Sequence, residues 1–177
     1  MPPKITYGSY ELVCFHEAGH AATAIQVGAQ INEIEIYEDN GRYFGRTNAN
    51  RTDEQSRHIL LGGFAAEYQI YEAGRLVKPD GNAPDKSEFI YNSIRNATID
   101  RQKFFELQFN AFLTEDEEWP TWMDKAFVNF AIGRAKNEMP SAAVERIAYG
   151  LSGQRKLDGD AIRAAFDGES AGTDHRP

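Results

Sequence analysis

The chain has 177 residues, of which 41% are hydrophobic and 26% are charged, and this composition is typical of one soluble globular domain. A net charge of −8 argues against affinity for nucleic acid or for anionic membranes. No stretch approaches the roughly 18 apolar residues that span a bilayer, and the first residues lack the apolar core of a signal peptide. The single cysteine excludes an intrachain disulfide. We therefore expect a cytoplasmic protein, with one domain over residues 1–167 and a disordered tail over residues 168–177.

The first expected elements are a helix and a β-hairpin. Ser9 is a good N-cap for a helix that ends near Gly28, which is a natural C-cap residue. β-branched residues dominate positions 31–37, which favours a strand. The sequence Asp-Asn-Gly at 39–41 predicts a turn, and residues 42–48 are expected to form the returning strand.

A second helix is expected over residues 53–72, with two adjacent glycines, Gly62 and Gly63, inside it. Each glycine costs a helix about 1 kcal/mol relative to alanine, and such a cost usually indicates the close approach of another backbone. We expect this helix to press against the first one, which also carries small residues. The small residues of the two helices are Ala18, Gly19, Ala21, Ala22, Gly62, Gly63, Ala65 and Ala66.

The remainder of the chain is expected to be helical. A loop over 74–84 precedes a helix that begins near Asp85 and extends to about residue 113, and an acidic break covers residues 114–120. Further helices are expected over 121–138, 141–151 and 158–166. An aromatic-rich stretch is interpreted as core rather than as a binding stripe; it comprises Phe104, Phe105, Phe109, Phe112, Trp119 and Trp122. The predicted fold class is mainly α, with a small β-hairpin or sheet near the N-terminus.

The strongest chemical signal is an HExxH motif, His16-Glu17-Ala18-Gly19-His20, on the first predicted helix. Histidines four residues apart project from one face of a helix, where they can bind one Zn²⁺. The intervening glutamate lies close to any water on that metal and can act as a general base. Cys14 lies on another face of the helix and is expected to be a core residue.

A catalytic zinc needs a third protein ligand and one open position. Spacing alone leaves Glu67 and Asp85 nearly tied for that role. Asp85 also begins a capping box with Glu88, a structural role that competes for the same carboxylate. The full set of candidates is Glu67, Asp80, Asp85, Glu88, His58 and His175, of which His58 is expected at the surface and His175 in the tail.

Several blocks resemble the FtsH family of membrane-anchored, ATP-dependent zinc proteases. Residues 15–21 (FHEAGHA) resemble its HEAGHA signature, and residues 61–67 (LGGFAAE) are similar to its GGRAAE helix, with Phe64 in place of arginine. Residues 81–85 (GNAPD) resemble its GASND segment. Residues 147–151 and 156–162 are similar to its closing stretch. The blocks follow the order of the family and span residues 10–166.

The resemblance implies a zincin-like helical domain in which His16, His20 and Asp85 hold Zn²⁺ and Glu17 is the base. It also implies that the hairpin lies beside the cleft, where one strand could pair with an extended substrate. The substrate-binding residues expected on that strand are Tyr43, Phe44, Gly45 and Arg46.

The sequence departs from the family in two respects. It contains no GxxxxGK[ST] phosphate loop, and we expect no membrane anchor. Such a protein would not unfold substrates with ATP by itself. It would cleave flexible segments of peptides or unfolded proteins, or it would depend on a separate unfoldase as partner. The oligomeric state is left open, because the rings of the family are organised partly by the ATPase.

The leading hypothesis is a zinc-dependent metalloendopeptidase that hydrolyses peptide bonds by Glu17-assisted attack of a zinc-bound water, without an ATPase of its own. The alternative is a weakly active or inactive regulatory module on a metallopeptidase fold, which would bind partners through the cleft or the aromatic region. A third hypothesis is a zinc hydrolase that acts on a non-peptide amide.

Overall fold

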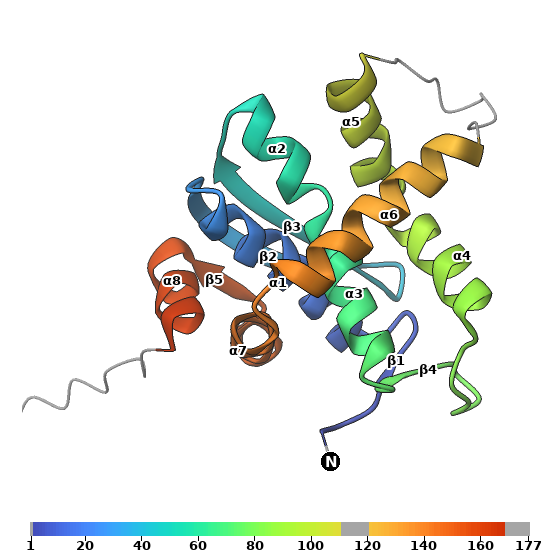
Figure 1. Cartoon of the computed structure of the whole chain (residues 1–177). Coiled ribbons are helices and arrows are strands. Elements are labelled where there is room, and N and C mark those ends of the chain that lie inside the picture. The colour runs from blue at the N-terminus through green and yellow to red at the C-terminus, as the bar shows by residue number, and fades with distance from the viewer. Residues whose placement is uncertain (1, 111–120, 169–177) are drawn as a thin grey trace, which may run out of the picture.

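The computed structural model describes residues 2–110 and 121–168, and it confirms a mainly helical fold with small sheets (Figure 1). Within this part of the chain, no helix is long and apolar enough to cross a membrane. The expected tail lies outside the described residues, except for Gly168. Helices α1 to α5 span Tyr10–Gln26, Asp53–Ile59, Gly62–Glu72, Lys86–Asn96 and Thr98–Phe109. Helices α6 to α8 span Thr121–Asn137, Ser141–Gln154 and Gly159–Asp167.

Helix α1 lies at the centre of the molecule and packs against α3, α7 and strand β3. It begins as the sequence predicts, because the Ser9 hydroxyl accepts the Leu12 amide hydrogen at 3.2 Å. It ends just before Gly28, whose φ of +72° is easily adopted only by glycine. Cys14 is buried, as expected of a core residue. The motif residues therefore lie on a capped helix that packs against several other elements.

The predicted hairpin is present and forms part of a three-stranded sheet. Strand β2 (Gln30–Asp39) pairs antiparallel with β3 (Arg42–Asn50) through a two-residue turn at Asn40 and Gly41, both with positive φ. On its other side β2 pairs with β5 (Lys156–Asp158), so β3 is an edge strand of the described sheet. A separate parallel pair joins β1 (Ile5–Thr6) to β4 (Leu76–Val77), which the sequence did not predict.

The expected close approach of two helix backbones is confirmed at Gly19 of α1 and Gly62 of α3. A Cβ added at Gly19 would overlap the Gly62 carbonyl and the Ala66 methyl, and a Cβ at Gly62 would overlap the Gly19 carbonyl. Because the two main chains are so close at this contact, side chains of α3 can reach the motif histidines.

We expect Gly19→Ala to destabilise the protein by about 1–3 kcal/mol or more, because the added methyl meets fixed backbone and forces the helices apart. Gly133→Ala is the matched control, since a Cβ at this position in α6 has nothing within 4 Å. That control should stabilise the fold by up to about 1 kcal/mol through helix propensity. Urea unfolding of both variants checks the prediction, and equal stability for the two would refute the close contact.

Two helices that the sequence predicted as continuous are each divided in two. The helix expected over 53–72 is interrupted at Leu60 and Leu61, so the glycine pair opens α3 instead of lying in mid-helix. The helix expected from Asp85 to about residue 113 is interrupted at Ala97, where φ is −90° and ψ is 25°. Both changes of direction bear on the site, because each creates a helix end beside α1.

The aromatic stretch divides between core and surface. Phe104 and Phe105 are buried in the core, as expected, whereas 37% of Phe109 and 54% of Trp122 is exposed. The other two aromatic residues, Phe112 and Trp119, lie outside the described residues. The interpretation as core therefore holds for the first pair only.

Candidate metal centre

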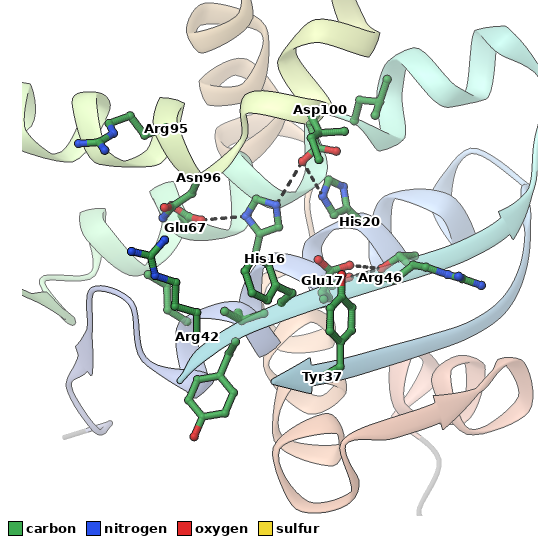
Figure 2. Close-up of a pocket in the computed structure, with 18 of the residues that line it drawn as sticks. His16, Glu17, His20, Tyr37, Arg42, Arg46, Glu67, Arg95, Asn96 and Asp100 are labelled. Atoms are coloured by element: carbon green, nitrogen blue, oxygen red, sulfur yellow. Dashed lines mark hydrogen bonds and ion pairs between the residues drawn. The ribbon is translucent and has the colours of Figure 1, made fainter. Parts of the chain in front are cut away.

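The two motif histidines point the same nitrogen at one carboxylate. The Nε2 atoms of His16 and His20 lie 3.3 and 3.2 Å from Oδ2 of Asp100, which is in the first turn of α5 (Figure 2). The side chains of His16, His20 and Asp100 are 12%, 7% and 21% exposed. The three ligand-type atoms thus converge at a site that is largely shielded from water but still open on one side.

The other nitrogen of each imidazole is held by a fixed acceptor. Nδ1 of His20 donates to the Ile59 carbonyl at 2.7 Å. Nδ1 of His16 donates to Oε1 of Glu67 at 2.8 Å, and the Ser93 hydroxyl donates to Oε2 of Glu67 at 2.6 Å. Because each Nδ1 carries its hydrogen toward an acceptor, a neutral imidazole presents its Nε2 lone pair to the Asp100 side. Hydrogen bonds of this kind orient the histidine ligands of metal sites.

The two Nε2–Oδ2 distances, which are hydrogen-bond distances in the structure, are also close to those between ligands of one metal ion. Ligand atoms bound to zinc at about 2.0–2.2 Å in tetrahedral geometry lie about 3.3–3.5 Å from one another. The two Nε2–Oδ2 distances of 3.3 and 3.2 Å are close to this value. Two nitrogen lone pairs and a carboxylate oxygen form a donor set that zinc accepts readily.

The electrostatics of the group also favour positive charge at that point. Burial acts to lower the pKa of His16, but hydrogen bonds to Asp100 and Glu67 raise it well above its ordinary value. Burial acts to raise the pKa of Asp100, yet the charge of His20 and the hydrogen bonds from both imidazoles bring it far below its usual range. A cation, whether proton or metal, is therefore stabilised between these side chains.

Glu17 is held beside the histidines by the edge strand. Its Oε2 accepts the Thr47 hydroxyl at 2.7 Å, and the Gly45 backbone of β3 lies so close that a Cβ there would overlap the Glu17 side chain. His16, Glu17 and His20 offer one ligand atom each within 4.8 Å of one another, a group that could hold a metal ion. The motif thus forms a compact cluster, with its carboxylate anchored through one oxygen.

A cavity of about 750 Å³ opens over this cluster, between β3 and the junction of α4 with α5. His16, Glu17, His20 and Asp100 all line it, and Asp100 lies directly beside the two imidazoles (Figure 2). The residues predicted to bind substrate all line it, namely Tyr43, Phe44, Gly45 and Arg46. Their role in binding stays a prediction, whereas their place at the cavity is a feature of the structure.

Asp85, the third ligand implied by the family resemblance, is not beside the histidines. It is the N-cap of α4, where its Oδ1 accepts the Glu88 amide hydrogen at 2.9 Å and Glu88 in turn accepts the Asp85 amide hydrogen. It does not line the cavity. The structural role that the sequence allowed for Asp85 is therefore present, and the aspartate that contacts both Nε2 atoms is Asp100.

The remaining candidates for a third ligand are placed elsewhere, apart from Glu67. Glu67 contacts Nδ1 of His16, on the far side of the ring from Nε2, so it orients the imidazole. His58 is exposed, as predicted, and His175 is outside the described residues. Asp80 caps a turn by accepting the Asn82 amide hydrogen at 2.9 Å.

Sequence reasoning missed Asp100, because nothing in the sequence marks the change of direction at Ala97. Alanine is the strongest helix former, so the local signal favours continuing the helix. An acidic residue in the first turn of a helix is a usable sign only once the helix start is known.

No protein-family model matches the chain, and no curated protein sequence matches it significantly.

Proposed function

We propose that this protein is a zinc-dependent metallopeptidase, related in mechanism to the FtsH-type peptidase domain, whose zinc is held by His16, His20 and Asp100. The observation that carries the proposal is the convergence of both Nε2 atoms on Oδ2 of Asp100 beside Glu17. When bound, Zn²⁺ would acidify a water and polarise a carbonyl oxygen.

The side chains of the site divide the remaining work. Glu17 takes a proton from the attacking water and later delivers it to the leaving amine, as a general base and then a general acid. Thr47 fixes one carboxylate oxygen of Glu17 by its 2.7 Å hydrogen bond, which leaves the other oxygen for the proton. Glu67 and the Ile59 carbonyl hold the two imidazoles in one tautomer.

The edge strand supports a peptide as the substrate. β3 has no neighbour on its outer side within the described sheet, and its residues 42–47 line the cavity next to Glu17. An extended chain can add to such an edge by main-chain hydrogen bonds, which places a peptide carbonyl near the general base without any demand on side-chain identity. This arrangement favours an endopeptidase over a hydrolase of small amides.

Removal and return of metal tests the proposal. We expect purified protein to cleave unfolded casein or a quenched fluorescent peptide, to lose that activity in 1,10-phenanthroline, and to regain it on addition of stoichiometric Zn²⁺. A chelator-treated protein that keeps its activity would contradict the metal dependence. Protein that binds zinc but cleaves no peptide would favour a binding module on this fold.

A further inference from the structure

Among the described residues, the charged side chains that line the cavity outside the metal cluster are all cationic, although the protein as a whole has a net charge of −8. Its acidic lining residues are Glu17, Glu67 and Asp100, all committed to the metal cluster. The cationic lining residues, which we call the basic rim, are Arg42, Arg46, Arg51, Arg95 and Lys103. All five are exposed.

Carboxylates of the described residues do little to neutralise the basic rim. Within residues 2–110 and 121–168, only Arg46 among them forms an ion pair, and its contact with Glu33 is long at 3.9 Å. Glu33 is in addition paired with Lys156 at 2.9 Å. Arg95 lies over the ring of Tyr91, 5.5 Å from its centroid, rather than against a carboxylate. As far as the described residues go, the rim therefore keeps its charge available for a ligand.

The rim cations flank the metal cluster. In the view of Figure 2, Arg42 and Arg95 lie on one side of His16, and Arg46 lies on the other side of Glu17. Arg42 and Arg46 are four residues apart on β3 and share one face of the strand, about 13 Å apart along it. A substrate strand paired to this edge would present residues with the same spacing to them.

We propose that the substrate is an acidic polypeptide segment, with Asp or Glu residues about four positions apart on either side of the scissile bond. This proposal rests on the proposed function. A short extended chain in the cavity would meet the metal cluster at its reacting bond and the rim cations on either side. A nucleic acid, in contrast, would extend beyond the cavity and would be repelled by the net charge of −8 of the chain. Charge complementarity confined to the cavity thus favours an acidic peptide.

Peptide binding to a variant that cannot hydrolyse peptides tests the preference for acidic substrates independently of catalysis. The probe is a fluorescein-labelled extended peptide with two glutamates four positions apart, and its control is the same peptide with glutamines in their place. Fluorescence anisotropy measures the binding of each peptide to zinc-loaded Glu17→Gln protein. We expect the acidic peptide to bind more tightly by about threefold to fivefold for each rim cation engaged, and the difference to shrink as salt is raised.

Adding Arg42→Gln and Arg95→Gln to that protein should remove most of the difference between the two peptides. Lys86→Gln with Lys125→Gln is the matched control, since it removes two exposed cations that do not line the cavity, and it should leave the difference intact. Equal binding of the acidic and amide peptides, or no response to the arginine changes, would overturn the inference. A thymidine oligonucleotide that binds more tightly than the acidic peptide and depends on the same arginines would overturn it in favour of nucleic acid.

Hydrolysis of the two peptides by the unmodified protein distinguishes failure of the acidic preference from failure of the proposed peptidase function. If the amide peptide is cleaved as efficiently as the acidic one, the peptidase stands and the acidic preference is refuted. If neither is cleaved while charge-dependent binding persists, the rim assignment stands and the peptidase is refuted.

Discussion

Glu17→Gln is expected to reduce peptide hydrolysis about 10²- to 10⁴-fold while zinc remains bound. The amide keeps the shape of the side chain and can still accept the Thr47 hydroxyl through its oxygen, so the local packing is preserved. It cannot take a proton from water, and the step that depends on the base is lost. Initial rates on a fluorescent peptide, together with zinc content by mass spectrometry, measure both halves of the prediction.

The matched control for this variant is Glu11→Gln, which makes the same chemical change at an exposed position of the same helix. It should change neither rate nor zinc content. A Glu17→Gln protein that retains the activity of the unmodified protein would exclude Glu17 as the base. One that loses zinc as well would show that the carboxylate is a ligand instead.

Asp100→Ala is expected to lower zinc affinity by more than about 100-fold. Changing a residue that only orients a ligand lowers it by about 10- to 100-fold, and Asp100 is proposed to be a ligand itself. Without the carboxylate, the two Nε2 atoms lack the negative charge that faces them at 3.2–3.3 Å. Competition against a chromophoric chelator measures the affinity.

Asp85→Ala is the natural counterpart, because the family resemblance implies that Asp85 is a zinc ligand, whereas in the structure it is the N-cap of α4. Losing the N-cap of α4 should cost about 1 kcal/mol of stability and leave zinc affinity unchanged. If Asp85→Ala released the zinc and Asp100→Ala kept it, the ligand assignment would return to the one that the FtsH resemblance implies.

The sequence predicts those parts of the fold whose signals are local. Ser9 and Gly28 delimit α1 through their capping chemistry, and Asn40-Gly41 sets the hairpin through its turn. The glycines of α3 predicted the close approach of another backbone, and this is confirmed at Gly62, whose Cβ would overlap the Gly19 backbone, whereas a Cβ at Gly63 would overlap the His16 imidazole. In each case, neighbouring residues carry the information.

The third member of the candidate site could not be predicted in this way. Its position depends on the change of direction at Ala97, which is set by tertiary packing against local helix propensity. Asp85 offered a stronger local signal, because a capping box is visible in four consecutive residues. Distances between segments some 80 residues apart depend on how the helices pack, and a single sequence does not report them.

In the proposed site, His16, His20 and Asp100 hold one zinc ion. Crystals of zinc-loaded protein, measured on both sides of the zinc absorption edge, test it most directly through an anomalous difference map. The structure predicts one peak within bonding distance, about 2.0–2.2 Å, of both Nε2 atoms and of the Asp100 carboxylate. A peak bonded to Asp85 instead of Asp100, or no peak at the histidines, would contradict it.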